Sequence, residues 1–448
     1  MNTISRKIRK LSLALCLVIL LPFLLSPFAG AALYDSEKIF SPSAAVYNVE
    51  NGIFIFEKNA DEFISATAAA KLMTAVLALE HFGGDISRTV TVTTESLKNV
   101  DKAVAGFRVG DTVSIKDLLY ASLIGNCTYS ASVLAYAVAG NQAAFGKLMN
   151  AKAAELGMTN TAFAGATCFG ADVNYYHTTV RDSVLLSAYA MKNPIIDKIV
   201  NTSIYTFESF TSSLNQTIRT KNAYFSTWVY GDAYYWKGTP APSGISFTYA
   251  EESGYSLISS INYRSLTYIC MCSGADKDAK DRIAAYDDVK KLLLWASDEY
   301  STVKVLDKSQ IFGEIPVSLS ESINYVVIVP ERHLYAFLPH DTDVEAEISQ
   351  VYEITVNGLT APVEKGVPVG KIRLYRNGEE IASCDLVTKS YVEKSASLAF
   401  KAAFFSPKMI IGMSISLFAA CLFGIIRFSV FLKMSKKRSS DRGKNSRK

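Results

Sequence analysis

The chain has 448 residues, of which 49% are apolar and 20% charged, and its formal net charge is only +4. A chain of this length and composition is expected to form more than one globular domain, which excludes a largely disordered protein. Basic residues are concentrated at the two ends, so the near-neutral middle argues against a nucleic-acid-binding body.

Residues 1–31 are typical of a secretory signal peptide. Four basic residues precede the apolar stretch from Leu11 to Leu25, and Ala29-Gly30-Ala31 offers small residues for cleavage. We expect cleavage after Ala31, and the alternative is an uncleaved N-terminal anchor.

Residues 32–300 are predicted to form one large domain that contains both helices and strands. Four strands are expected, at 44–49, 52–56, 256–261 and 266–271, with a tight turn at 50–52. Four helices are expected from apolar periodicity and helix-forming composition, at 71–82, 118–140, 179–191 and 281–300.

Residues 301–395 are predicted to form a small all-β domain. Short alternating runs such as 326–329 and 352–356 are separated by turns at Asn357-Gly358, Lys365-Gly366 and Asn377-Gly378.

The apolar run 407–432 is predicted to cross a membrane, because about 20 helical residues span a bilayer core. Between Met409 and Leu432 the one charged residue is Arg427, which lies close enough to the end of the run to reach the interface. The basic tail 433–448 is expected to be cytoplasmic, which places the body on the extracytoplasmic face of the plasma membrane. The alternative is a buried core helix.

The cysteines and histidines do not indicate a cofactor. Of seven cysteines, Cys16 belongs to the signal and Cys421 to the anchor, which leaves an odd number elsewhere and no disulfide framework. Four histidines without cysteine at zinc-ligand spacing predict no metal site.

Six segments, in chain order, carry a recognisable set of motifs: ATAAAKLMTA (66–75), DLLYA (117–121), AYAVAG (135–140), HTTVRD (177–182), ESGYSL (252–257) and LTAPVEKG with a following VG (359–370). Together they resemble the low-molecular-weight penicillin-binding proteins, the D-Ala-D-Ala carboxypeptidases of peptidase family S11. The resemblance implies a transpeptidase/β-lactamase-like α/β (α+β) domain, with an antiparallel sheet flanked by helices, followed by the small β domain.

The resemblance also implies where the catalytic groups of the family would lie. A serine and a lysine three residues apart share one helix face, and the lysine takes the proton of the serine. Lys71 matches this base, but the nucleophile position is Ala68. The second motif, S-G-N in the family, falls on Asn126, Cys127 and Thr128, and the third, K-T-G, falls on Ser246, Phe247 and Thr248.

Four substitutes for the missing groups can be considered. They are Thr67 at i−4 from Lys71, Cys127 as a thiol nucleophile, Lys237 in a shifted third motif, and the S-x-x-K run Ser301–Lys304. Each also has an ordinary structural interpretation, and Lys71 itself is expected to hydrogen-bond nearby carbonyl groups and Asn126.

These features predict a membrane-anchored homologue of the serine D-Ala-D-Ala carboxypeptidases that is catalytically inactive. Its expected partner is a peptidoglycan stem peptide or a cell-wall protein, with no nucleic acid and no cofactor. One alternative is an active carboxypeptidase with relocated catalytic residues. The other is a non-enzymatic scaffold of the cell envelope.

Overall fold

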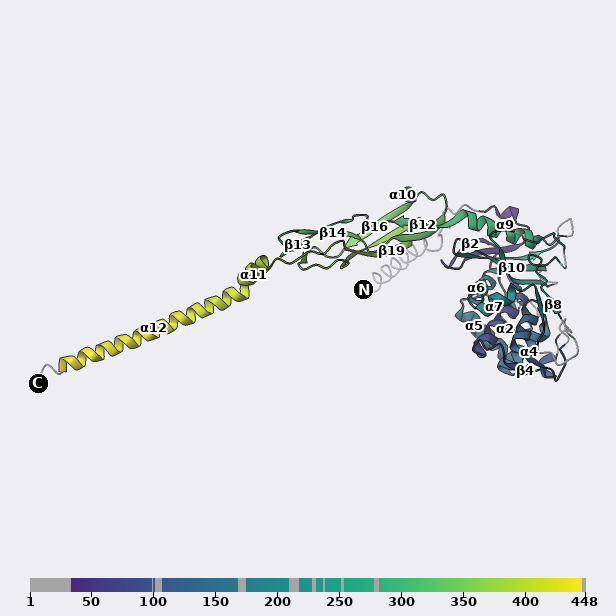
Figure 1. Cartoon of the computed structure of the whole chain (residues 1–448), viewed down its shortest axis with the longest axis horizontal. Helices are drawn as coiled ribbons and strands as arrows, with labels where there is room; N and C mark the ends of the chain where they lie inside the picture. Colours follow the sequence, from purple (N-terminus) through teal and green to yellow (C-terminus); the bar gives the residue numbers. More distant parts are fainter. Residues whose placement is uncertain are drawn as a thin grey trace, which may run out of the picture. The chain divides into compact units, whose positions relative to one another are not determined.

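The structure is a computed structural model that describes residues 34–98, 100, 107–167, 175–208, 217–227, 231–236, 238–250, 254–277 and 282–444. The chain divides into two compact units, each described here by itself (Figure 1). The first unit holds the described residues up to Ser301 together with Phe337–Asp341, and the second holds Thr302–Ala336 and the residues from Thr342 onward.

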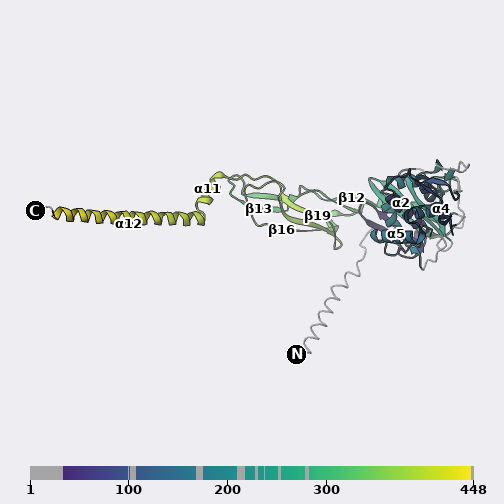
Figure 2. The same ribbon diagram turned by 90° about the horizontal axis from the view of Figure 1, so that it is seen from below.

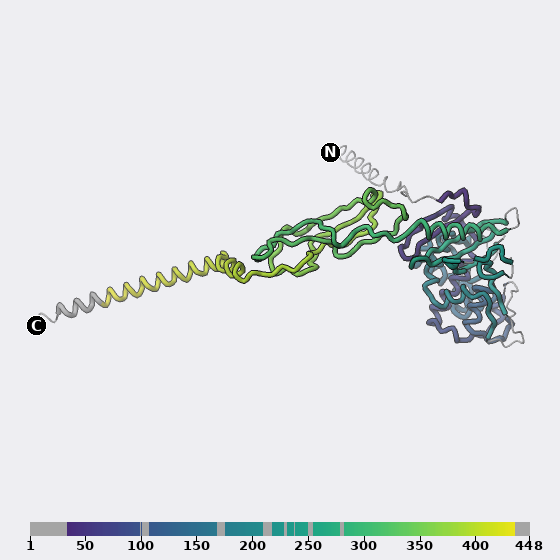
Figure 3. The backbone as a smooth tube through the Cα atoms, turned by 45° about the horizontal axis from the view of Figure 1, so that its top comes forward, coloured from purple at the N-terminus to yellow at the C-terminus, as the bar shows by residue number. Residues whose placement is uncertain are grey.

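The first unit is built on a five-stranded antiparallel sheet. Its order is β2 (Ile53–Lys58), β1 (Ser43–Asn48), β11 (Leu266–Ala275), β10 (Gly254–Tyr263) and β9 (Pro242–Ala250). Strand β1 therefore lies beside β11, which comes much later in the chain, and Figure 3 shows purple and green parts of the tube close together in this unit. The predicted strands at 44–49, 52–56, 256–261 and 266–271 are confirmed.

Helices cover both faces of this sheet (Figure 1). On one face lie α2 (Thr67–His81), α3 (Ile115–Leu123), α4 (Thr128–Ala139), α5 (Gln142–Glu155), α6 (Val180–Ala190) and α7 (Pro194–Val200), and on the other lies α9 (Ala284–Glu299). Strand side chains alternate between the two layers, as a period of two requires. Ile269 and Met271 join the core beneath α2, whereas Cys270 and Cys272 join the core beneath α9.

Shorter elements complete this unit. Three two-stranded ribbons pair β3 (Ile64–Ser65) with β6 (His177–Thr178), β4 (Thr89–Thr91) with β5 (Thr112–Ser114), and β7 (Ile204–Thr206) with β8 (Thr217–Arg219). Two 3-10 turns are η2 (Ser36–Lys38) and η3 (Glu95–Leu97). The expected fold class, an antiparallel sheet flanked by helices, is confirmed.

The central helix α2 begins four residues before the predicted start at 71. Its first turn is rich in alanine, the residue with the best helix propensity, so residues 67–70 favour an earlier helix start. Every residue from Thr67 to Leu79 is buried, as expected for a helix that is apolar nearly all round. The earlier start places Ala68 inside the helix.

The single helix predicted over 118–140 is wrong, because the structure has two helices there. The chain leaves α3 after Leu123 and enters α4 at Thr128. Asn126 has φ +56°, which no right-handed helix accommodates, and Cys127 is extended. At Gly125 an added Cβ would lie 2.7 Å from the carbonyl oxygen of Ala121, so this turn requires glycine.

The second unit contains the predicted small β domain. A six-stranded sheet has the order β16 (Ile348–Ile354), β18 (Pro368–Arg376), β19 (Glu379–Thr388), β14 (Tyr325–Pro330), β13 (Gly313–Ser318) and β17 (Leu359–Thr360). Strands β12 (Tyr300–Leu306) and β15 (Leu334–Pro339) pair with each other, and α10 (Val344–Glu347) is a single turn. The predicted turn Asn377-Gly378 joins β18 to β19, with positive φ at both residues.

Two helices follow the β domain, and the first of them was not predicted. Helix α11 (Ala396–Phe404) precedes α12 (Pro407–Lys444), which is one continuous helix (Figure 2). Within the described residues, the segment Pro407–Met434 of α12 is the one helix long and apolar enough to cross a membrane, with a mean hydropathy of 2.4. The helix continues through most of the basic tail, because that tail holds no proline. Membrane insertion stays a prediction.

Candidate functional site

Lys71 lies one turn after Ala68 on α2, so the two residues share a helix face. The Lys71 side chain is buried. Its Nζ donates to the Oδ1 atom of Asn126, and also to the Asn126 main-chain oxygen at 3.4 Å. The structure therefore brings the first and second motif positions together through the hydrogen bond expected of a structural lysine.

The buried surroundings of Lys71 lower its affinity for a proton. Burial lowers the pKa of Lys71 from 10.5 to about 8. Of the smaller effects, the neighbouring Cys127 raises this pKa and the positive charge of Lys221 lowers it. In the part of the chain that the structure describes, no carboxylate forms an ion pair with Lys71. The amine therefore loses its proton at a lower pH than an exposed lysine does, and the residue three positions before it is an alanine.

The second-motif residues form the break between α3 and α4. Cys127 precedes the first helical residue of α4, Thr128, and is completely buried. A nucleophile must reach its substrate, so the alternative of Cys127 as nucleophile is not supported. The buried thiol instead packs in the core as a small apolar group.

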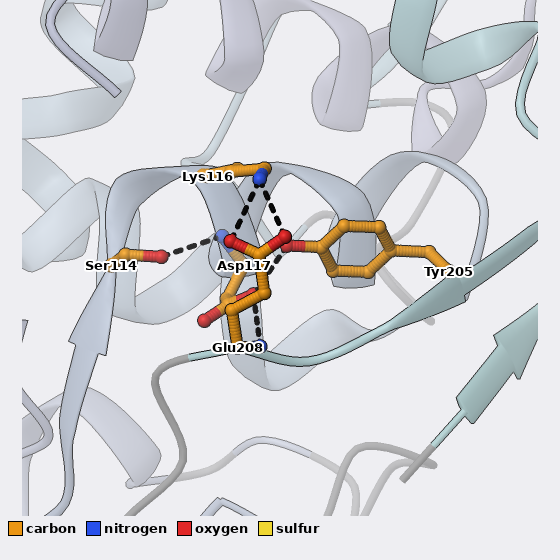
Figure 4. Close-up of polar contacts among 5 residues, drawn as sticks. All are labelled: Ser114, Lys116, Asp117, Tyr205 and Glu208. Atoms are coloured by element: carbon orange, nitrogen blue, oxygen red, sulfur yellow. Dashed lines mark hydrogen bonds and ion pairs between the residues drawn. The ribbon is translucent and has the colours of Figure 1, made fainter. Parts of the chain in front are cut away.

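A polar network surrounds the start of α3, with the buried Asp117 at its centre and the exposed Glu208 at its edge (Figure 4). The N–H of Asp117 donates to Ser114 Oγ at 3.0 Å, and Asp117 Oδ1 accepts from the Tyr205 hydroxyl at 2.6 Å. Lys116 pairs with Glu208 at 2.8 Å, and the Glu208 N–H donates to Asp117 Oδ1 at 3.3 Å. Burial, followed by the adjacent Asp117 carboxylate, raises the pKa of Tyr205.

This network was missed in the sequence analysis. Asp117 appears there only as the first residue of the DLLYA segment, and its partner Tyr205 lies 88 residues further along the chain. No spacing pattern connects two residues at that distance. The ring of Tyr205 also stacks on Tyr120 at 3.7 Å, which ties β7 to α3 a second time.

The third-motif residues lie on the edge strand β9. A pocket is lined by four segments: the end of α3 with the loop after it, the end of α7, the residues after β8, and β9. Its lining residues are Leu123, Ile124, Asn126, Val200, Thr220, Lys221, Asn222, Gly244, Ile245, Ser246 and Phe247. The second and third motif positions, which are 120 residues apart in the sequence at Asn126 and Ser246, thus meet at one pocket.

Phe247 lines the pocket, but its ring also belongs to the aromatic layer beside α9. It stacks on Tyr255 at 6.1 Å and packs on Tyr286 at 5.3 Å. Thr248 is buried, pairs with Ser256 of β10 and is not among the lining residues. Phe247 therefore both lines the pocket and packs in the aromatic layer beside α9.

The other suggested substitutes fall in different places. The Thr67 and Ser65 hydroxyl groups are 2.9 Å apart and hydrogen-bonded to each other. Ser301 and Lys304 lie on strand β12, where residues i and i+3 point to opposite faces, so this S-x-x-K run cannot act as a pair. Lys237 lies outside the described residues.

Lys221 and Asn222 are pocket residues that the sequence analysis missed. Lys221 is exposed, and Asn222 is only 5% exposed. Asn222 Oδ1 accepts from the N–H of Tyr224 at 3.0 Å, while its Nδ2 has no hydrogen-bond partner among the described residues. A lysine beside an asparagine is too common in sequences to mark a site.

Comparison with known proteins assigns the class of the molecule. Residues 31–275 match the family model of D-alanyl-D-alanine carboxypeptidases, peptidase family S11, and residues 300–394 match the C-terminal domain of penicillin-binding protein 5. The chain belongs to the S11 family of low-molecular-weight penicillin-binding proteins, as its motifs suggested.

The curated relatives are similar over most of their length. The chain is 24% identical to the D-alanyl-D-alanine carboxypeptidase DacF of Bacillus subtilis, over 88% of this chain and 96% of the relative. It is 26% identical to DacC of Escherichia coli, over 83% of this chain and 90% of that protein.

Solved structures share the fold. Penicillin binding protein 6B from Escherichia coli superposes with a TM-score of 0.59 at 20% identity, covering 81% of this chain and 98% of that one. Penicillin binding protein 5 from Haemophilus influenzae gives 0.57 at 21% identity, with 80% and 98% coverage.

Proposed function

We propose that this protein is a membrane-anchored member of the S11 family that binds a cell-wall stem peptide, or a cell-wall protein partner, without hydrolysing it. The relatives are named D-alanyl-D-alanine carboxypeptidases, so a peptide ending in D-alanyl-D-alanine is the substrate class to test first.

The observation that carries the inactive assignment is the pair Ala68 and Lys71. Serine acyl transfer requires a hydroxyl group within hydrogen-bond reach of a base. Here a methyl group stands on the turn where that hydroxyl would be, and the Lys71 amine donates to Asn126. With a pKa of about 8, most of the Lys71 amine is protonated at neutral pH, and its neutral fraction has no hydroxyl group at the family position from which to take a proton.

The remaining motif positions support the same proposal. Asn126 carries an amide, which cannot relay a proton as a hydroxyl group does. Ser246 carries no charge for a substrate carboxylate. These positions meet at one pocket, so their changes affect a single site.

Peptide binding is supported by the place of β9 in the sheet. Strand β9 is at the edge, hydrogen-bonded to β10 on one side only, and its residues Gly244 to Phe247 line the pocket. An extended peptide adds to such an edge through main-chain hydrogen bonds, while a neighbouring pocket selects its side chains.

The proposed location rests on the two ends of the chain. Cleavage of residues 1–31 and insertion of α12 would leave both compact units on the extracytoplasmic side. The basic residues after Lys433 would remain in the cytoplasm.

The test is incubation of the full-length protein in detergent with a fluorescent penicillin and, separately, with a D-Ala-D-Ala peptide. We expect no covalent adduct and no release of D-alanine, because loss of a serine nucleophile costs on the order of 10⁶ in kcat. A stoichiometric adduct mapped to any residue would instead establish an active enzyme with relocated groups. Failure to bind stem peptide by calorimetry would favour a scaffold that does not contact peptidoglycan peptide.

A further inference from the structure

The geometry points to a second binding site in the first unit, a groove over α4 that receives a chain of N-acetylated amino sugars, the chemistry of a cell-wall glycan. The inference goes beyond the proposed peptide binding, and it rests on the proposed cell-wall role only for the identity of the sugar. The groove has a volume of about 630 Å³, within the range of about 300–1,000 Å³ that is typical of ligand sites. None of the family's motif positions lines it.

The floor of the groove is one face of α4. Val133, Ala137 and Gly140 are spaced at i, i+4 and i+7, which puts them on the same side of the helix, and Tyr136 lies beside them. Residues at the end of α2 and residues of β4 and η3 complete the lining, and Figure 1 labels β4 and α4 at the same end of this unit. The floor therefore offers apolar and aromatic contact area for the C–H faces of sugar rings.

Strand β4 presents a free main-chain edge to this groove. The Val92 N–H donates to the Asp111 carbonyl oxygen at 2.9 Å, next to the β4–β5 pair. Hydrogen bonding alternates along an antiparallel pair, so the main-chain groups of Thr89 and Thr91 point away from β5. Both threonines line the groove, and no main-chain hydrogen bond joins either of them to another described element. An acetamido group has the donor and acceptor of a peptide group, so it suits this edge.

The side chains around the edge are hydrogen-bonding groups that are not engaged with the rest of the described chain. Arg88 and Glu95 form no ion pair with a described residue, and the Tyr136 hydroxyl forms no hydrogen bond with one. The Arg88 guanidinium lies over the ring of Phe82, 5.1 Å from its centre. This contact restrains the guanidinium without using its N–H donors.

Glu95 is held at the groove by the turn η3. Ser96 Oγ donates to the Thr93 carbonyl oxygen at 2.8 Å and accepts from the Thr93 N–H at 3.1 Å. Ser132 of α4 donates to the Ser96 carbonyl oxygen at 2.5 Å, which fastens η3 to the helix that forms the floor. Glu95 is therefore an exposed side chain on a fixed main chain, and a fixed group loses less entropy when a ligand binds.

The balance of charge in the groove favours an uncharged ligand. Arg88 and Glu95 contribute one charge of each sign, and no other lysine, arginine, aspartate or glutamate lines it. The nearby Asp85 carboxylate accepts from the Ser87 hydroxyl at 2.5 Å and forms no ion pair with Arg88. Sugar hydroxyl groups can accept from the guanidinium and donate to the Glu95 carboxylate.

The same features favour a sugar chain over an extended peptide. A peptide added to β4 would use the free edge, but the strand has only 3 residues and allows few main-chain hydrogen bonds. Such a peptide would leave most of the side-chain hydroxyl groups, Arg88 and Glu95 without partners. An N-acetylated sugar chain uses both sets of groups, with acetamido groups on the edge and hydroxyl groups on the side chains.

The experiment measures calorimetric binding of two tetrasaccharides to the full-length protein, in a detergent without a sugar headgroup. One is tetra-N-acetylchitotetraose, and the other is cellotetraose, which has the same linkage without acetamido groups. The wild type should bind the acetylated sugar about 10-fold more tightly, because only its acetamido groups can hydrogen-bond to the β4 edge as a peptide would.

Variants of the groove locate the site. Arg88→Gln and Glu95→Gln should each weaken binding of the acetylated sugar by about 10-fold, and Ala137→Phe, which fills the floor, should abolish it. Arg264→Gln is the matched control and should leave the affinity unchanged. Arg264 is also exposed, and its guanidinium lies over the Tyr263 ring, 5.0 Å from its centre.

The outcomes separate this inference from the proposed peptide binding, because the sugars carry no peptide. If the wild type does not bind the acetylated sugar, or if the three groove variants bind it as the wild type does, the site is overturned. Equal binding of cellotetraose would show that the assignment to N-acetylated sugars is wrong. If the groove variants instead lose binding of a stem peptide, the groove is a peptide site and the inference fails. If the wild type binds the acetylated sugar but no stem peptide, the proposed peptide binding fails while this site stands.

Discussion

Replacing Lys71 by methionine should change how the stability of the first unit depends on pH. The Lys71 side chain is buried, and burial lowers its pKa from 10.5 to about 8. Below pH 8 the amine is protonated in both the folded and the unfolded protein, so the folded state carries the full cost of a buried charge. Between pH 8 and 10.5 the folded protein loses this proton first, so stability is gained as pH rises.

The size of the effect follows from the shift. A difference of about 2.5 pKa units, at 1.36 kcal/mol each, corresponds to about 3 kcal/mol, of which about 2 to 3 kcal/mol is recovered between pH 7 and pH 10. Methionine has nearly the same length as lysine and does not titrate. The free energy of unfolding of Lys71→Met therefore lacks this rise with pH. It also leaves the Oδ1 of Asn126 without its donor, which costs about 1–3 kcal/mol at every pH. The prediction therefore concerns how the stability difference between the two proteins changes with pH. It does not concern which of them is more stable at pH 7.

Urea unfolding followed by tryptophan fluorescence measures this directly. All three tryptophans, at 228, 236 and 295, belong to the first unit, so the fluorescence change reports on that unit. The free energy of unfolding of the wild type minus that of Lys71→Met should rise by about 2 to 3 kcal/mol from pH 7 to pH 10. Other titrating groups cancel in this difference. Parallel curves for the two proteins would refute the assignment of a destabilised charge to Lys71.

Four further outcomes are expected. Ala68→Ser alone should give at most slow acylation by penicillin and no measurable D-alanine release, because a hydroxyl at Asn126 and a cation at Ser246 are still missing; robust release would show that the second and third motifs are misplaced. Tyr205→Phe should lower the free energy of unfolding by about 1–3 kcal/mol, measured in urea, since it removes a donor to buried Asp117, and an unchanged midpoint would contradict this. Gly244→Ala should destabilise the first unit by about 1–3 kcal/mol through overpacking against Phe225, whereas Gly358→Ala, whose nearest neighbour would be 3.8 Å away, should cost less. Protease added outside intact cells should remove both units and leave the tail after Lys433 protected; cleavage of that tail would mean that the anchor is inverted or absent.

Local sequence patterns predicted most of the elements of this fold. Alternation placed the strands around Val46, Ile258 and Ile269, and the Asn377-Gly378 pair placed the hairpin of the second unit. These features depend on neighbouring residues, whose spacing sets which side chains face the core. The ordered motifs also led to the family, because a motif is a local string that survives low overall identity.

The break between α3 and α4 was not predictable from the same patterns. Residues 118–140 are apolar enough to continue one helix, and the break depends on Asn126 adopting positive φ. That conformation is held by the hydrogen bonds from Lys71, which lies 55 residues earlier in the chain. A local pattern contains no information about such a partner.

The sequence by itself determined which residues stand at the family's motif positions, including Ala68 before Lys71. Only the tertiary structure decided what surrounds them. It brought Lys221 and Asn222 to the pocket of Asn126 and Ser246, and it buried Lys71 so that its pKa falls to about 8. The physical reason is that desolvation and the proximity of charges depend on residues that are distant in the chain, and only packing sets the distances between them.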